Sequence, residues 1–210
     1  IPTATPIVAA LTTPFRARHP NVRFSVQSTT SGEIGRLIAD LEIDAGITYL
    51  ENEPLGRLTA VPLYRERYRL LTAIDGVFGE RESVTWDEVA SLPLCLLTPD
   101  MQNRRIIDNL ALSIGLTIRP IVVSNSFLGI CAHLRQGGFA SIVPHTFRHL
   151  FGGTADLAML DLVEPAHRQA VGLVLSDRDP LAPMAAALSR IVLDADLETR
   201  VAAAEARIGR

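Results

Sequence analysis

Residues 22–49 read VRFSVQSTTSGEIGRLIADLEIDAGITY, and this stretch decides the predicted fold. Its first five residues alternate apolar and polar side chains, a pattern typical of a strand. Thr30, followed three residues later by Glu33, has the spacing of a helix capping box and predicts a helix over Ser31–Leu41. The apolar run Ile43–Tyr49 predicts a second strand. The stretch is therefore expected to form a strand, a helix and a strand in succession.

The same alternation of strands and helices continues beyond residue 49, and a second α/β unit begins at Thr85. Alternating units of this kind imply mostly parallel sheets flanked by helices, which bind ligands outside the carboxyl ends of their strands. Beyond residues 22–49, helices are predicted over Thr5–Arg18, Thr85–Ser91, Asn103–Ile114, Phe127–Arg135 and Leu181–Leu193, and strands over Leu58–Tyr64, Tyr68–Ala73, Leu94–Leu97, Arg119–Val123, Ala140–Val143 and Gln169–Leu175.

The last strand and helix are expected to return to the first α/β unit, so that the chain crosses twice between two lobes. The predicted fold class is α/β, with two Rossmann-like lobes joined by two hinge crossings. Residues 1–66 and 168–210 form lobe I in this prediction, and residues 67–167 form lobe II.

Composition limits the possible functions. The 210 residues are 48% hydrophobic and 20% charged, which is ordinary for a packed globular protein. Lysine and arginine total 20 against 23 acidic residues, and the basic residues are not concentrated, so we do not expect this chain to hold nucleic acid by itself. Its apolar runs are far shorter than the roughly 20 residues that cross a bilayer, so no membrane segment is expected. Cys95 and Cys131 lack metal-binding or disulfide-framework spacing, which suits a reducing cytosol.

Hydroxyl and amide side chains gather at four predicted strand-to-helix junctions. The first turn of a helix leaves backbone N–H groups unpaired and carries partial positive charge, so several such starts around one cleft would favour an anion or carboxylate. The same residue types are preferred as helix N-caps, so each junction also has a purely structural interpretation. Arg104, or Arg105 beside it, could hold a ligand carboxylate through its planar fork of donors. The junctions comprise Thr3 and Thr5; Thr29, Thr30 and Ser31; Thr98, Gln102 and Asn103; and Ser124, Asn125 and Ser126.

Catalytic and metal-binding interpretations find little support. Cys131 and His133 lie two apart on a predicted helix and face different sides, which makes them a poor nucleophile and base. His145 and His149 have the spacing of a metal-binding pair, but no carboxylate lies between them, and an exposed helix face explains them more simply. Nucleotide-binding glycine motifs and nucleophile-elbow motifs are absent from the sequence. We therefore predict no enzyme activity, no cofactor and no metal site.

The order of several short segments resembles the LysR-type family of bacterial transcription regulators. The resemblance spans nearly the whole chain, and the order of the segments is more specific than any one of them. The segments are FRARHPNV at residues 15–22, LEIDAGI at 41–47, LYRE at 63–66, Asn125 with Ser126, and LRQGGFASIVP at 134–144.

The resemblance implies the effector-binding domain of a cytoplasmic regulator, with the architecture of type 2 periplasmic binding proteins. A small-molecule effector would bind between the lobes, the chain would form a homodimer or tetramer, and DNA would be contacted only through an N-terminal winged helix-turn-helix that is absent here. Pro2 stands where many relatives have a ligand-binding serine or threonine, which moves that contact to Thr3. By position, the family's ligand contacts fall on Pro2 and Thr3, Ser31, Thr98 to Asn103, and Asn125 to Phe127.

Two rival functions share the same fold. The chain begins Ile1-Pro2-Thr3, without a start methionine or an apolar signal segment, so we expect it to be cut from a longer protein. A mature solute-binding protein of a transporter, its signal peptide removed, would begin in the same way. An enzyme on this scaffold would need a paired acid and base or a metal cluster, which the sequence does not offer. The sequence does not identify the effector.

Overall fold

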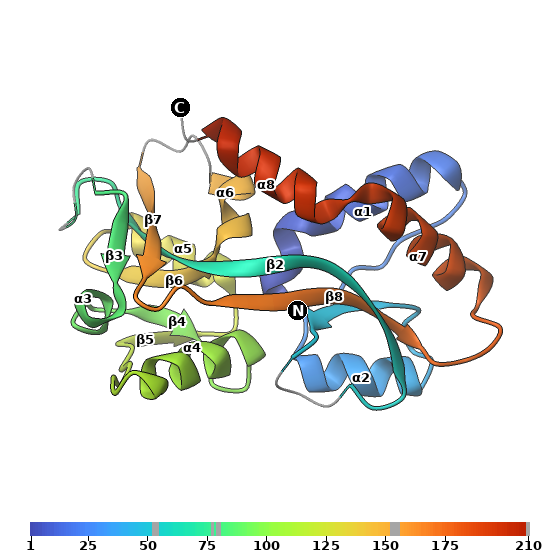
Figure 1. Cartoon of the computed structure of the whole chain (residues 1–210), viewed down its shortest axis with the longest axis horizontal. Helices are drawn as coiled ribbons and strands as arrows, with labels where there is room; N and C mark the ends of the chain where they lie inside the picture. The colour runs from blue at the N-terminus through green and yellow to red at the C-terminus, as the bar shows by residue number, and fades with distance from the viewer. Residues whose placement is uncertain (52–54, 77, 79–80, 152–155, 209–210) are drawn as a thin grey trace. The chain divides into compact units, whose positions relative to one another are not determined.

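The structure is a computed structural model that describes the chain except for residues 52–54, 77, 79–80, 152–155 and 209–210. The chain divides into two compact units, one formed by Ile1–Glu66 with Gln169–Arg210 and the other by Arg67–Arg168 (Figure 1). It passes from the first unit to the second within strand β2 (Leu58–Ala73) and returns at the start of strand β8 (Arg168–Ser176).

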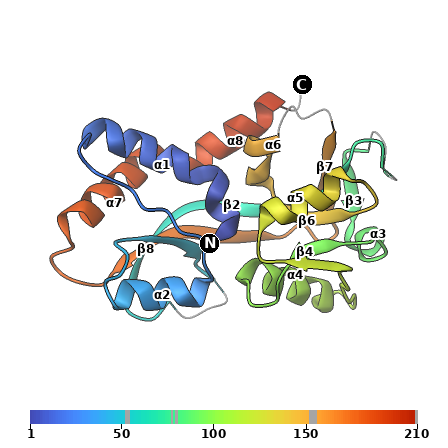
Figure 2. The ribbon, with the colours of Figure 1, turned by 180° about the vertical axis from the view of Figure 1, so that it is seen from behind.

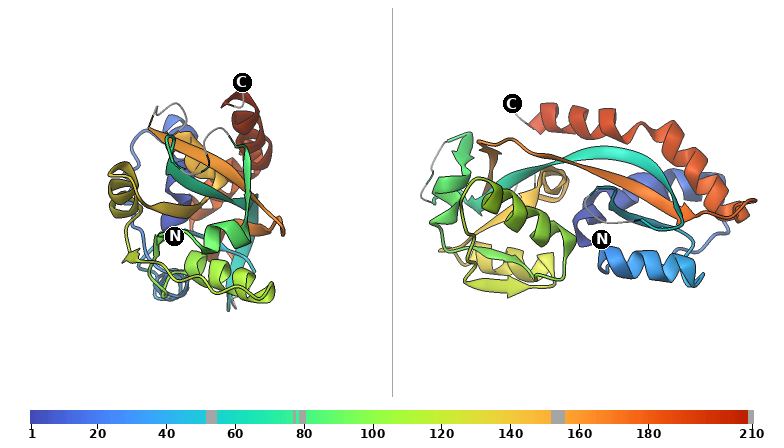
Figure 3. Two further views of the ribbon diagram at one scale, coloured as in Figure 1. Left: turned by 90° about the vertical axis from the view of Figure 1, so that its left-hand side faces the viewer. Right: turned by 60° about the horizontal axis from the view of Figure 1, so that its bottom comes forward.

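The first unit packs helices against a small sheet. Strand β1 pairs antiparallel with β8, Gly46 opposite Val174, and β8 also neighbours β2. Helices α1 and α7 contact one another (Figure 2), and α8 follows α7 after a turn (Figure 3). Besides β1 (Gly46–Tyr49), the elements of this unit are the 3-10 helix η1 (Pro2–Ala4), α1 (Thr5–Arg18), α2 (Ser31–Ala39), α7 (Pro183–Ala195) and α8 (Leu197–Ile208).

Helix α2 is held in place by its amphipathic pattern and its cap. Ile34 and Ile38, one turn apart, pack with Val174 of β8 to form a buried cluster, because residues four apart lie on the same helix face. The Thr30 side chain accepts a hydrogen bond from the Glu33 N–H at 3.3 Å and so begins the helix where the cap spacing predicted.

The second unit surrounds a larger core. β2 pairs antiparallel with β6 and β7, β3 pairs parallel with β7, and β4 pairs parallel with β5. A parallel bridge joins Leu94 to Ala140, next to β4 and β6. The elements are β3 (Ser83–Thr85), α3 (Trp86–Ala90), β4 (Cys95–Leu97), α4 (Gln102–Ser113), β5 (Val122–Ser124), α5 (Phe127–Arg135), β6 (Ala140–Pro144), the 3-10 helix η2 (His145–Phe147), α6 (Arg148–Phe151) and β7 (Leu157–Val163).

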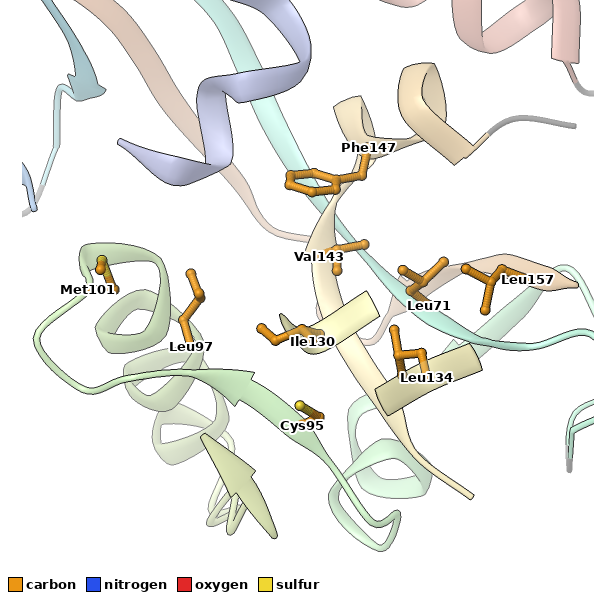
Figure 4. Close-up of a cluster of buried hydrophobic side chains, with 9 residues drawn as sticks. All are labelled: Leu71, Cys95, Leu97, Met101, Ile130, Leu134, Val143, Phe147 and Leu157. Carbon is orange, nitrogen blue, oxygen red and sulfur yellow. The ribbon is translucent and has the colours of Figure 1, made fainter. Parts of the chain in front are cut away.

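The core of the second unit draws on most of these elements. Figure 4 shows its buried side chains, contributed by β2, β4, α5, β6, η2 and β7 and by the residue that precedes α4. Ile130 and Leu134 of α5 are four residues apart and both fully buried. The cluster comprises Leu71, Cys95, Leu97, Met101, Ile130, Leu134, Val143, Phe147 and Leu157.

The predicted α/β fold class is confirmed, and the predicted helices Thr5–Arg18 and Phe127–Arg135 have the observed bounds. Three other predictions are wrong. Val22–Val26 is not a strand, since most of its side chains are exposed and its alternation reflects no buried face. The two strands predicted within 58–73 are one, because buried Glu66 continues the pleat between them. The sheets are mixed rather than mostly parallel, because β6 and β7 both run antiparallel to β2.

The short elements η1, β3, η2 and α6, strand β7 (Leu157–Val163) and helix α8 (Leu197–Ile208) were not predicted from the sequence. Among the helices that the structure describes, none has the length and apolar character needed to cross a membrane.

Replacing Leu134 with alanine should lower the free energy of unfolding by about 2–5 kcal/mol, because the side chain is fully buried and its loss leaves a cavity. Leu128 lies on the same helix but is 81% exposed, so Leu128→Ala should change stability by less than about 0.5 kcal/mol. Urea unfolding of both variants measures the difference. Equal effects would contradict the assigned core face of α5.

Candidate functional site

A pocket lies in the first unit where α2 begins beside β1. It has a volume of about 60 Å³. The first turn of α2 forms part of its wall, so backbone N–H groups at the positive end of a helix border it. The lining residues are Ser31, Gly32, Ile34 and Gly35 of α2, Thr48 and Tyr49 of β1, and Leu55 and Leu58.

Two hydroxyl groups of this pocket are buried without a hydrogen-bond partner in the structure. They are Ser31 Oγ and Thr48 Oγ1, and the Thr48 residue is only 2% exposed. Leaving a buried hydroxyl unpaired costs about 1–3 kcal/mol, so both groups are suited to bind a polar ligand or water. Ser31 was predicted from the sequence and Thr48 was not. A polar residue inside the apolar strand GITY is the signal that could have found it.

Behind the pocket, Tyr49 joins a buried polar cluster. Its hydroxyl donates to Glu66 Oε1 at 2.6 Å and lies 3.2 Å from Thr3 Oγ1, while the Tyr64 hydroxyl lies 3.4 Å from Glu66 Oε2. Burial raises the pKa of Glu66 to about 8, although the hydrogen bonds from the two tyrosines act in the opposite direction. The predicted contact Thr3 is therefore placed inside this cluster, and Pro2 lies beside it in η1.

The second unit gathers its candidate residues at one edge of its strands. Because β4 runs parallel to β5 and the bridge at Leu94 is also parallel, the carboxyl ends of β4, β5 and β6 lie on the same side. The Thr98 N–H donates to the Ser124 carbonyl at 3.2 Å and joins two of these ends. Thr98 Oγ1 and Thr146 Oγ1 are buried and unpaired. Thr146, missed by the sequence analysis, is a hydroxyl residue shortly after a predicted strand.

The predicted residues at the start of α4 are buried and serve local structure. Arg104 donates from Nη1 to the Leu97 carbonyl at 3.1 Å, which joins α4 to β4, and from Nε to Asp108 of the same helix at 2.8 Å. Gln102 Oε1 accepts hydrogen bonds from Arg105 at 2.6 and 3.0 Å. Asn103 is buried beside them. The guanidinium donors that were predicted to hold a ligand carboxylate are therefore largely engaged by the protein itself.

The predicted residues at the start of α5 are more accessible. Asn125 and Ser126 are exposed, and the Ser126 side chain accepts a hydrogen bond from the Gly129 N–H as the N-cap. Phe127 is half-buried, with its ring centroid 4.4 Å from that of Phe147. These residues adjoin Thr98 through the Ser124 hydrogen bond described above.

The interpretation of His145 as part of an exposed helix face is wrong. His145 is 2% exposed, because the 3-10 turn η2 directs it inward, and its Nδ1 accepts a hydrogen bond from the Arg67 N–H at 3.1 Å. Burial, followed by the charges of Arg67 and Arg69, lowers the pKa of His145 to about 3. His149 is exposed, as expected. Within the described residues, no group of three histidine, cysteine or acidic side chains could hold a metal ion.

His145 should make the protein less stable in acid. A histidine with a lowered pKa in the folded state stabilises above its unfolded pKa of 6.5 and loses that contribution as pH falls toward 3, at up to about 1.4 kcal/mol per pH unit. In His145→Asn, whose amide oxygen can still accept from Arg67, the free energy of unfolding should depend less on pH between 6.5 and 4. Urea unfolding across this range, with His149→Asn as the control, measures the effect. Parallel curves for the two variants would contradict it.

Comparisons with known proteins place the chain within a family. The family model described as the LysR substrate binding domain matches residues 1–196. No curated protein sequence matches the chain.

Solved structures resemble the chain in fold. A cysteine mutant of OxyR from Corynebacterium glutamicum superposes with a TM-score of 0.77 at 20% identity, covering 97% of this chain and 65% of the other. The effector binding domain of QuiR in complex with shikimate gives 0.75 at 18%, covering 89% and 88%. The effector binding domain of BenM with benzoate gives 0.75 at 14%, covering 90% and 85%. The chain thus spans just under two thirds of the OxyR chain.

Proposed function

The chain belongs to the LysR substrate-binding domain family, and from that premise we propose that it senses a small anionic or polar effector and thereby controls DNA binding and transcription. This family is one of ligand-binding regulatory domains rather than enzymes. The solved effector complexes of QuiR and BenM support the same role for this chain. They do not favour the rival interpretation as a transporter's solute-binding protein.

One observation carries the proposal: each unit has buried, unpaired hydroxyls where a helix begins or a strand ends. Ser31 and Thr48 occupy such positions in the first unit, and Thr98 and Thr146 do so in the second. We propose that an effector satisfies hydroxyls of this kind, with Pro2, Thr3, Thr30, Gln102, Asn103, Arg104, Asn125, Ser126 and Phe127 as contacts or supports. A ligand that binds two conformations equally shifts nothing, so the effector is expected to bind one conformation of the chain more tightly than the other.

The regulatory output follows from the family. We propose that this conformational change passes through the interfaces of a homodimer or tetramer to DNA-binding heads in an N-terminal winged helix-turn-helix, in the cytoplasm. The described part of the chain supplies an apolar surface for such contacts, since Phe24 is 41% and Val26 is 63% exposed near the end of α1. Exposed apolar side chains of this size are suited to an interface.

Ser31→Ala and Thr98→Ala should each weaken effector binding about tenfold, because each removes a hydrogen bond to the ligand. The effector is first found by thermal-shift screening against small carboxylates and inorganic anions, and affinity is then measured by calorimetry. Ser28→Ala, an exposed hydroxyl just before α2, serves as the control and should bind normally. Unchanged affinity in both variants would contradict the assignment of Ser31 and Thr98 to the effector site.

Val26→Asp should shift the chain from dimer toward monomer in sedimentation, because a charge replaces an exposed apolar side chain that we place in the interface. Thr59→Asp adds the same charge at an exposed position of β2 and should leave the dimer intact. A wild-type monomer at high concentration would argue against dimerisation through this surface.

A further inference from the structure

Glu66 is a fully buried carboxyl whose hydrogen-bond partners are hydroxyl groups. It is 0% exposed on β2, and Tyr49 and Tyr64 approach it from β1 and β2 at 2.6 and 3.4 Å. Thr3 of η1 extends the cluster from the far side of the Tyr49 hydroxyl. An ionised carboxylate without a cationic partner is costly to bury, so this environment favours the neutral acid.

Tyr49 connects this acid to the pocket. It lines the pocket next to Thr48, and its hydroxyl contacts Glu66. An anion bound beside Ser31 and Thr48 would therefore share Tyr49 as a neighbour with the Glu66 carboxyl. Two negative charges repel strongly in an interior of low dielectric constant, so the anion and an ionised Glu66 oppose one another.

We propose that Glu66 couples ligand binding in this pocket to a proton: an anion binds beside Tyr49 only while the Glu66 carboxyl holds its proton. The inference rests on the proposed function, because it concerns the same ligand site. In the neutral state the carboxyl can donate to the Tyr49 oxygen and Tyr49 can donate to Thr3. In the ionised state the carboxyl O–H bond has broken, its proton has passed to solvent, and the Tyr49 hydrogen turns to Glu66.

The pH dependence follows from linkage. Below pH 8 Glu66 is mostly protonated, and anion affinity changes little with pH. Above pH 8 the fraction of chains with protonated Glu66, the form that binds the anion, falls about tenfold for each pH unit. For an anion that requires the protonated form, affinity falls about tenfold between pH 7 and pH 9.

Sulfate and acetate are suitable probes, because neither changes its charge between pH 7 and pH 9. Their affinities for the wild-type chain are measured by calorimetry at both pH values and should be about tenfold weaker at pH 9. Glu66→Gln cannot ionise and should bind equally at the two pH values. Asp44→Asn removes one exposed negative charge of the same unit and should retain the tenfold difference.

Tyr49→Phe keeps the test decisive if Glu66→Gln does not fold. Loss of the Tyr49 hydrogen bond removes a contact that lowers the pKa of Glu66, so the fall in affinity should move to higher pH. Infrared absorption of the protonated carboxyl, present in the wild type at pH 7 and absent from Glu66→Gln, reports the same titration without ligand.

The outcomes separate this inference from the proposed function. The proton coupling is overturned if either anion binds with equal affinity at pH 7 and pH 9. It is also overturned if the tenfold pH dependence persists in Glu66→Gln. Either result leaves the proposed effector site in place. If neither anion binds at either pH, the pocket is not an anion site, and the coupling falls with the part of the proposed function that assigns it an anionic ligand.

Discussion

Strand β2 is the constraint on which the rest of the structure depends. Its sixteen residues supply backbone hydrogen bonds to both units, beside β8 in the first and between β6 and β7 in the second. A strand pleats with a period of two, so the alternation that buries Tyr64 also places Glu66 and then Tyr68 inside. The chain therefore carries a carboxyl into the interior at the point where one unit gives way to the next.

Burying polar groups is the recurring cost of this architecture. Glu66 is stabilised by tyrosine hydroxyls rather than by a cation, and burial keeps His145 neutral while its Nδ1 accepts a hydrogen bond from the Arg67 N–H. Ser31, Thr48, Thr98 and Thr146 have hydroxyls that the protein leaves unsatisfied. A protein that keeps such groups at helix starts and strand ends gives up stability in the empty state and recovers it when a ligand supplies the missing bonds. A sensing role uses this difference, because ligand binding is then linked to conformation.

The same principle applies to Arg104 and Arg105, whose guanidinium donors bond to acceptors within the protein itself. Guanidinium groups near the start of α4 find carbonyl and carboxylate acceptors within the protein, and the bond from Arg104 to the Leu97 carbonyl joins the helix to β4. The site that we propose therefore consists mainly of small hydroxyls and backbone N–H groups. Such groups have little conformational freedom to lose and are well suited to orient a small molecule.

The sequence by itself determined the fold class, the main helices and most of the helix starts, because cap spacing and hydrophobic period are local properties. Thr30 and Ser126 cap the predicted helices for that reason. Tertiary structure alone decided which polar residues are buried and unpaired, since burial depends on segments far apart in the chain. For this reason the sequence analysis did not assign Thr48, Thr146 and His145 correctly. It also predicted a strand over Val22–Val26, where the side chains alternate but form no buried face. The direction of β6 and β7 relative to β2 was also decided by the tertiary structure, because these strands pair with one about seventy to ninety residues away. At that separation the connecting segments, rather than local β propensity, set the orientation of a strand.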